Sequence, residues 1–96
     1  MSKVYVTKKS AEGSYQCWFW CPGCGHSHAF TMPHWTWNGD ENKPSFQPSL
    51  MCNKGRRSLQ CHSVVTDGVI NFCSDSHHHL AGKSVAMEDW KGFGRG

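Results

Sequence analysis

The chain has 96 residues, is 38% hydrophobic, and carries a net charge of +3 at pH 7 from ten basic and seven acidic residues. A chain of this length makes one domain with a small core. The weak, scattered charge excludes the dense basic stripe of a dedicated duplex-binding protein. Since no apolar run is long enough for a signal peptide or a membrane helix, we expect a cytoplasmic protein that makes no membrane contact.

Period-two alternation predicts the elements of the first half. Residues 3–7 and 15–20 alternate aromatic or β-branched side chains with polar ones, which is typical of short strands. The second strand runs into the knuckle Cys21-Pro22-Gly23-Cys24-Gly25, and residues 29–32 are predicted to return as a third strand. Pro22 and Gly23 permit a tight reversal, so this segment predicts a hairpin with a metal-binding turn.

The second half predicts another hairpin after an irregular middle. Three prolines argue against regular structure in residues 33–49, and the chain is expected to be extended around residue 50 and over residues 59–65. A turn at residues 66–68 then gives a hairpin that ends at residues 72–73. Asp75 is a candidate cap for one helical turn through the three histidines that follow, ended by Gly82.

Together these elements predict one small, mostly β fold over residues 1–90, with zinc-ribbon-like hairpins around one structural metal and little helix. Residues 91–96 are expected to form a loose, Gly-rich tail. Five Trp and five Phe indicate a core of few, large aromatic side chains, and a chain this small gains from a metal cross-link.

A single Zn2+ ion is the predicted cofactor, because six cysteines in a reducing cytoplasm are more often metal ligands or buried thiols than disulfides. Cys21 and Cys24 lie two residues apart in the knuckle and supply two ligands. A three-residue turn in the second hairpin would place Cys61 opposite Cys73, whereas a two-residue turn would place His62 there. The predicted ligands are Cys21, Cys24, Cys61 and His78, with His62 and Cys73 as alternatives.

Residues 35–50 form a candidate binding surface that metal binding does not explain. Asn38 and Asp40 can close a turn while the aromatic residues fill the core. Alternatively, an aromatic face beside amide, carboxylate and hydroxyl groups can stack on a planar group and bond its edge. The candidate surface residues are Trp35, Trp37, Asn38, Asp40, Ser45, Phe46 and Ser49.

Several short motifs follow one another in a specific order: 21–26 (CPGCGH), 37–40 (WNGD), 44–50 (PSFQPSL), 61–63 (CHS), 67–68 (DG), Asp75, His78 and 80–82 (LAG). This order, over residues 15–90, resembles a family of small uncharacterised phage and prophage proteins. The resemblance implies a bacteriophage origin, the cytoplasm of a bacterial host and a zinc-ribbon-like fold, and it implies no particular activity.

The preferred function from sequence is therefore a phage accessory protein with a structural zinc that binds a macromolecule. A protein partner is favoured over nucleic acid because the net charge is weak, and the oligomeric state stays open. One alternative is sequestration of a nucleotide-like ligand by the tryptophans. The other is a zinc hydrolase with Asp75 or Asp40 as base, which is less favoured because cysteine-rich zinc sites are usually structural.

Overall fold

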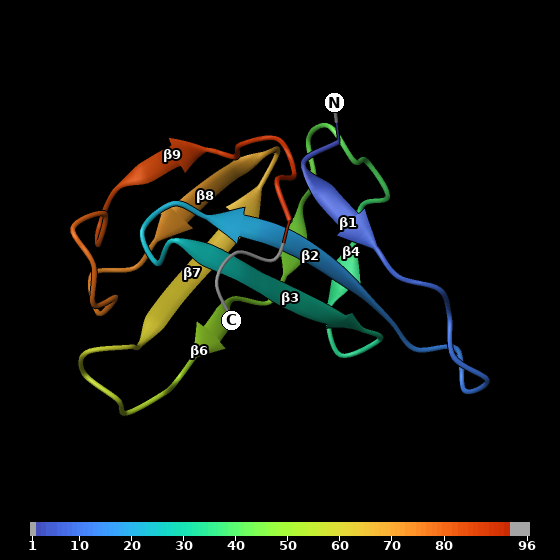
Figure 1. Ribbon diagram of the computed structural model, residues 1–96, viewed down its shortest axis with the longest axis horizontal. Helices are drawn as coiled ribbons and strands as arrows, with labels where there is room; N and C mark the ends of the chain where they lie inside the picture. The colour runs from blue at the N-terminus through green and yellow to red at the C-terminus, as the bar shows by residue number, and fades with distance from the viewer. Residues whose placement is uncertain (1, 93–96) are drawn as a thin grey trace.

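A computed structural model describes residues 2–92 of the chain, and all regular structure in that range is β (Figure 1). No helix in this range is long and apolar enough to cross a membrane. The nine strands are β1 (Val4–Val6), β2 (Tyr15–Cys21), β3 (His26–Met32), β4 (Thr36–Trp37), β5 (Phe46–Gln47), β6 (Leu50–Cys52), β7 (Cys61–Thr66), β8 (Val69–Phe72) and β9 (Ser84–Ala86). The predicted small, mostly β fold is confirmed.

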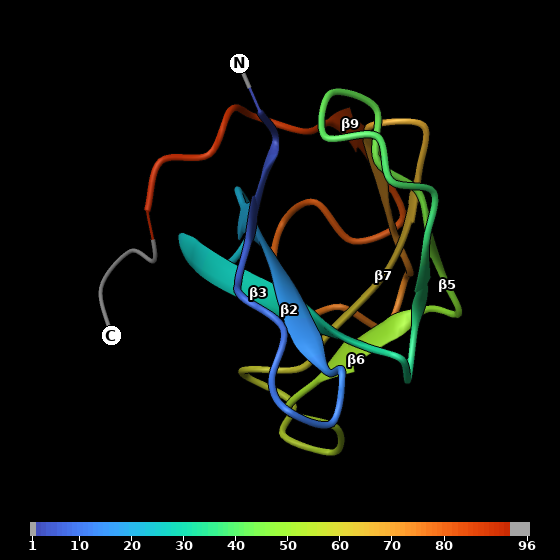
Figure 2. The same cartoon turned by 90° about the vertical axis from the view of Figure 1, so that its right-hand side faces the viewer.

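The strands form three antiparallel sheets, in the orders β1-β2-β3, β4-β5 and β6-β7-β8-β9. The three-stranded sheet lies on one side of the molecule and the four-stranded sheet on the other (Figure 2). The aromatic residues expected in the core fill the space between them. Phe30 stacks on Phe46 with ring centroids 4.1 Å apart and on Phe19 at 5.4 Å, while Trp35 meets Phe30 edge-on.

The predicted knuckle hairpin is β2–β3, and it is longer than expected. The pairing runs from Tyr15 opposite Met32 to Cys21 opposite His26, so β3 begins three residues earlier than the predicted residue 29. Every second residue of β2 from Cys17 to Cys21 is buried, as the period-two pattern requires. This alternation sends Cys21 into the interior at the point where the hairpin turns.

The predicted second hairpin is β7–β8, and its turn has two residues. Thr66 pairs with Val69, and the turn residues Asp67 and Gly68 have φ angles of 50° and 76°, as a type I′ turn requires. Of the two registers left open by the sequence, the two-residue turn is therefore correct. It places Cys73, whose N–H donates to the His62 carbonyl at 2.8 Å, opposite His62 rather than opposite Cys61.

Two segments differ from the prediction. The expected irregular middle contains the two-residue strands β4 and β5, which meet because the Asn38 Oδ1 accepts N–H groups from both Asp40 and Ser45. The expected helical turn after Asp75 is absent, and residues 77–82 form bends and turns that lead into β9. Since the Asp75 carboxylate instead faces His62 and Gln60, it does not cap a helix. Residues 93–96 of the predicted tail lie outside the described range.

Candidate functional site

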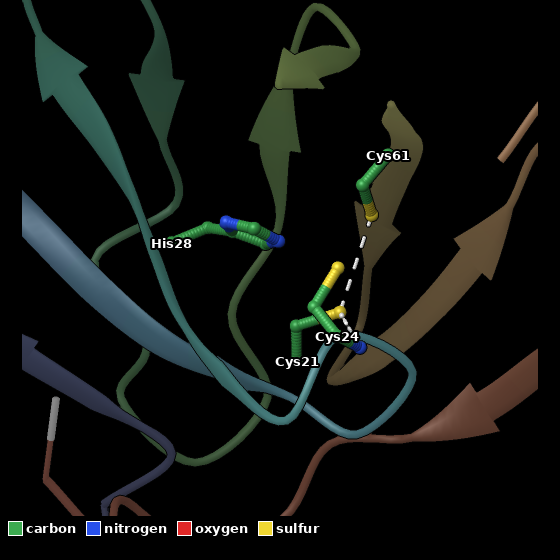
Figure 3. Close-up of side chains that lie close together, drawn as sticks. All are labelled: Cys21, Cys24, His28 and Cys61. Carbon is green, nitrogen blue, oxygen red and sulfur yellow. Dashed lines mark hydrogen bonds between the residues drawn. The ribbon is translucent and has the colours of Figure 1, made fainter. Parts of the chain in front are cut away.

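Three of the predicted metal ligands lie close together with a histidine (Figure 3). Cys21 ends β2, Cys24 lies in the knuckle, His28 is on β3, and Cys61 opens β7. One ligand atom from each of these four residues lies within 4.8 Å of the others, so the group can hold a metal ion. We refer to Cys21, Cys24, His28 and Cys61 as the metal group.

The contacts within the metal group fit a bound cation. The Cys21 and Cys61 sulfurs are 4.0 Å apart, and the Cys24 N–H points to the Cys21 sulfur at 3.4 Å. The side chains of Cys24 first and Cys61 second hold the pKa of the Cys21 thiol well below its usual range, which favours the thiolate that metals bind. The His28 Nε2 is buried and has no hydrogen-bond partner among residues 2–92, a costly arrangement that a metal ion would relieve.

His78, the predicted fourth ligand, lies at the edge of the metal group. Its Nε2 is 3.5 Å from the Cys61 sulfur, and its ring packs so tightly on the knuckle that a Cβ at Gly23 would lie 2.3 Å from it. His77 similarly approaches the Cys24 sulfur at 3.4 Å. The structure thus places His28 inside the group, a residue that the sequence analysis did not select. His28 lies two residues before the buried Phe30 on β3, and residues two apart on a strand face the same side. The position of Phe30 is therefore the signal that the His28 side chain points inward.

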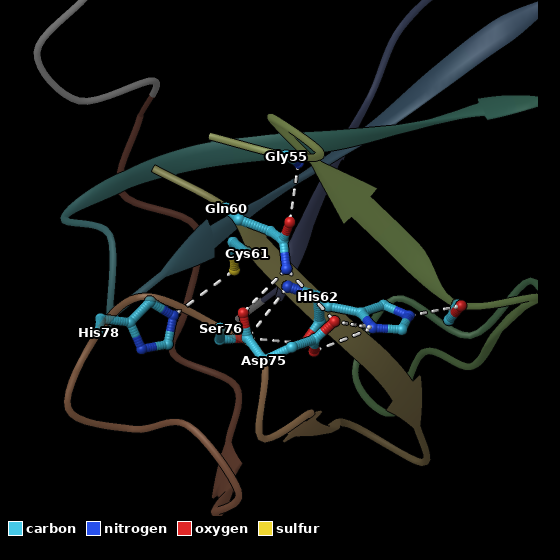
Figure 4. A network of polar contacts seen from close by, with 8 residues as sticks. Gly55, Gln60, Cys61, His62, Asp75, Ser76 and His78 are labelled. Carbon is cyan, nitrogen blue, oxygen red and sulfur yellow. Dashed lines mark hydrogen bonds and ion pairs between the residues drawn. The ribbon is translucent and has the colours of Figure 1, made fainter. Parts of the chain in front are cut away.

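A second set of polar side chains joins the start of β6, β7 and the loop after β8 (Figure 4). The His62 Nε2 lies 3.0 Å from the Ser49 hydroxyl oxygen. On the other side of the ring, Nδ1 lies 3.2 Å from the Asp75 Oδ1 and 3.3 Å from its Oδ2. Each nitrogen of one imidazole therefore contacts a different partner, a hydroxyl on one side and a carboxylate on the other. We refer to Ser49, His62 and Asp75 as the triad.

Neighbouring hydrogen bonds fix the position of His62 and Asp75. The buried Ser76 hydroxyl donates to the His62 carbonyl at 2.9 Å and accepts the His62 N–H at 3.0 Å. The Gln60 amide donates to the carbonyl and the carboxylate of Asp75 at 3.0 and 3.3 Å, and its oxygen accepts the Gly55 N–H at 2.8 Å. These bonds fasten the loop that carries Asp75 to the first residues of β7, so the carboxylate faces the imidazole.

The Ser49 backbone is held by the aromatic core. The Trp35 indole N–H donates to the Ser49 carbonyl at 3.2 Å, and Trp35 packs edge-on against Phe30. Ser49 itself is half-buried and directly precedes β6. Ser49 therefore contacts His62 from a position anchored to the core, and the residue as a whole is only half-buried, as a nucleophile that attacks an external substrate requires.

The triad has the arrangement needed for nucleophilic catalysis. A hydroxyl becomes a nucleophile when an adjacent base accepts its proton and a third group orients that base. Cys73 lies near the same histidine, but burial first and the charge of Asp75 second raise the pKa of its thiol. The Ser49 hydroxyl contacts the ring nitrogen opposite the one that faces the carboxylate, so Ser49 is the better placed candidate for attack.

The remaining residues of the predicted binding surface have different surroundings. Trp37, Asn38 and Ser45 line a pocket of about 260 Å³ together with Thr36 and Gln47. The other members lie elsewhere: Trp35 and Phe46 pack in the core, Asp40 accepts the N–H groups of Asn42 and Lys43, and Ser49 belongs to the triad.

A protein-family model matches residues 1–73 and is described as the bacterial ubiquitination-like system serine protease, BubE. The chain belongs to the BubE family. The matched range contains the whole metal group together with Ser49 and His62, and Asp75 follows two residues after it. Comparison with curated proteins gives no match, and none is found among solved structures.

Membership of the BubE family corrects the function predicted from sequence. The family is named for a serine protease of a bacterial system, which overturns the predicted phage accessory protein and does not fit ligand sequestration or zinc hydrolysis. From the sequence, Ser49, His62 and Asp75 are separate candidates: a surface residue, an alternative metal ligand, and a helix cap or zinc-site base. No local serine-protease motif links them, because the three positions meet only through the register of β6, β7 and β8.

Proposed function

We propose that this chain is a serine protease in which Ser49 is the nucleophile, His62 the general base and Asp75 the group that orients the base. The single observation that carries this proposal is the continuous contact from the Ser49 hydroxyl through both nitrogens of His62 to the Asp75 carboxylate. The name of the BubE family, a serine protease, supports the same assignment.

The geometry indicates how each step would proceed. The His62 Nε2, 3.0 Å from the Ser49 oxygen, accepts the hydroxyl proton as that oxygen attacks the carbonyl carbon of a peptide bond. Asp75 accepts a hydrogen bond from Nδ1–H, which keeps the proton off Nε2 beforehand and stabilises the imidazolium afterwards. His62 then gives its proton to the leaving amine. A water molecule, deprotonated by the same nitrogen, releases the acyl group from Ser49.

We further propose that the metal group holds one structural Zn2+ ion. Three sulfurs and one imidazole nitrogen make the closed, soft ligand set that structural zinc prefers. Four protein ligands leave no position for a metal-bound water, so the chemistry rests on the triad. When bound, the ion joins β2, the knuckle, β3 and β7 in a chain with a small core.

The family name also suggests the substrate. BubE is named within a bacterial ubiquitination-like system, so we propose that the chain cleaves a protein substrate belonging to such a system in the bacterial cytoplasm. Gln47 lies two residues before Ser49 and lines the pocket beside β4 and β5. This pocket is the proposed site for substrate residues next to the cleaved bond, where Trp37 offers an aromatic wall and Asn38 a polar edge.

Peptide hydrolysis by the purified protein tests the proposal. Wild-type protein is expected to cleave a general protein substrate, whereas Ser49→Ala, which removes only the nucleophilic oxygen, should be inactive while its melting temperature stays close to wild type. Cleavage that persists in Ser49→Ala and stops only when metal is removed would refute the serine mechanism.

A further inference from the structure

A second group of metal-ligating side chains overlaps the triad. One ligand atom from each of His62, Cys73 and Asp75 lies within 4.8 Å of the others. Cys73 is the cross-strand neighbour of His62, since its N–H donates to the His62 carbonyl at 2.8 Å, and cross-strand neighbours point to the same face of a sheet. The proton transfers described above make no use of this thiol. The proposed mechanism therefore does not explain why the Cys73 thiol lies beside His62.

We infer that His62, Cys73 and Asp75 form a second, exchangeable Zn2+ site that switches the protease off. A thiol, an imidazole and a carboxylate are all common zinc ligands, and ligand atoms around a tetrahedral zinc ion lie roughly 3.3 to 3.8 Å apart. The Nδ1 to Oδ2 separation of 3.3 Å matches this spacing, and the Cys73 sulfur lies within 4.8 Å of both other ligand atoms.

The surroundings of this second site favour exchange of the ion with solvent. Asp75 is exposed, and His62 and Cys73 are only half-buried. Three protein ligands leave the fourth position to water, as in open zinc sites. In the metal group, by contrast, Cys21, His28 and Cys61 are all buried and four protein atoms complete the coordination. Zinc is therefore expected to bind the second site more weakly and to dissociate faster.

Inhibition follows from the tautomer that the metal selects, and this step rests on the proposed serine mechanism. A zinc ion bound at the nitrogen facing Asp75 occupies the Nδ1 lone pair, so a neutral imidazole must carry its proton on Nε2. Nε2 then donates to the Ser49 hydroxyl instead of accepting its proton. The same ion takes the Asp75 carboxylate away from the base. Both changes remove the activation of Ser49.

The site itself is tested by binding, without reference to activity. Protein whose metal group has been filled with one equivalent of Zn2+ is titrated with Co2+, which absorbs strongly when a thiolate binds it. Wild type is expected to develop this absorption and Cys73→Ser to lose it. His79→Ala is the matched control for binding by the exposed histidine run, because His79 belongs to neither group, and it should keep the absorption. Equal absorption in wild type and Cys73→Ser would overturn the site.

Inhibition is tested by the rate at which a fluorophosphonate probe labels Ser49 as free Zn2+ is raised. Labelling of wild type should fall, and Cys73→Ser should need at least about tenfold more Zn2+ for half-inhibition, because loss of even an outer-shell partner of a metal ligand weakens binding by about 10- to 100-fold. Its labelling without added zinc should match wild type. Identical zinc sensitivity of the two proteins would overturn the inhibitory role. Absence of labelling in wild type that holds one equivalent of zinc in the metal group, with no zinc added, would instead refute the serine mechanism and the inhibition with it, while the Co2+ absorption still decides the site.

Discussion

Cys61 and His62 are consecutive residues of β7 whose side chains leave the strand on opposite faces. Cys61 is 1% exposed and faces the metal group, while His62 is half-buried and contacts Ser49 and Asp75. Because side chains alternate along a strand, an ion that fixes Cys61 also fixes the backbone from which His62 projects. The metal group and the triad thus lie on opposite faces of β7. We expect the metal to support catalysis only by holding the backbone of His62 in position.

Removal of the proposed structural metal should therefore destabilise the folded protein and stop the labelling of Ser49. Complete chelation is expected to lower the melting temperature sharply, because three sulfurs and His28 would be left around an empty centre. Cys61→Ser should bind less than one equivalent of zinc and show the same two losses. Elemental analysis, thermal unfolding and probe labelling on the same samples measure this coupling.

Cys17→Ala provides the control for the metal experiment. Cys17 is fully buried on β2, and burial first and Glu41 second raise the pKa of its thiol to about 12, so it is a neutral core residue outside the metal group. Its replacement should cost about 1 kcal/mol of unfolding free energy and leave the metal content at one equivalent. Loss of zinc in Cys17→Ala, with retention in Cys61→Ser, would contradict the assigned ligand set.

Replacement of the base and of its orienting group should reduce turnover without unfolding the protein. His62→Ala removes the proton acceptor and Asp75→Asn removes the carboxylate that selects its tautomer, and each change is expected to lower kcat by about 10⁴-fold. Steady-state hydrolysis of a peptide substrate gives these values. Double replacement should cost little more than either single change, because the three groups act as one unit. Additive losses would show that the residues act independently.

Ser76 is a positioning residue for His62, and its loss should change kcat more than KM. Ser76→Ala deletes a buried hydroxyl that bonds both backbone polar groups of His62, at a cost of about 1 to 3 kcal/mol in unfolding free energy. In protein that remains folded, we expect kcat to fall while KM is preserved. Ser74→Ala, which alters an exposed neighbour, is the control and should match wild type. A fall in stability with unchanged kcat would limit Ser76 to a structural role.

The contact between Gly23 and His78 predicts a coupled pair. A Cβ at Gly23 would lie 2.3 Å from the His78 ring, so Gly23→Ala must displace the ring and should cost about 1 to 3 kcal/mol. In a His78→Ala background the same change should cost much less, because the obstructing ring is gone. Chemical denaturation of the four proteins in this cycle gives the coupling energy. Equal cost in both backgrounds would contradict the packing of His78 on the knuckle.

Local patterns predicted much of the fold, because hairpins follow from neighbouring residues. The alternation in residues 15–20 and the Asp67-Gly68 turn each specify a structure over a short stretch of chain. The β4–β5 pair was not predicted because Asn38 organises it through a side chain that also bonds Ser45, seven residues away. The prediction that Asp75 caps a helix was wrong for a similar reason, because the carboxylate instead contacts His62 and Gln60, which are distant in the sequence.

The residues of the candidate site were also predictable only in part. Cys21 and Cys24 lie two residues apart and were predictable as a pair, and Cys61 was the best remaining thiol. His28 required knowledge of which face of β3 is buried. The triad could not be predicted, because Ser49 and His62 lie 13 residues apart and meet only through the β6–β7 register. This register places Met51, two residues after Ser49, opposite His62.

The role of Ser49 as the nucleophile is tested most directly by the mass of the intact protein, filled with one equivalent of zinc, after incubation with a fluorophosphonate probe. We expect one covalent adduct, mapped to Ser49 by peptide sequencing, which is absent in Ser49→Ala and forms much more slowly in His62→Ala. An adduct on a different residue, or no adduct on a folded, zinc-loaded protein, would contradict the assignment of Ser49 as the nucleophile.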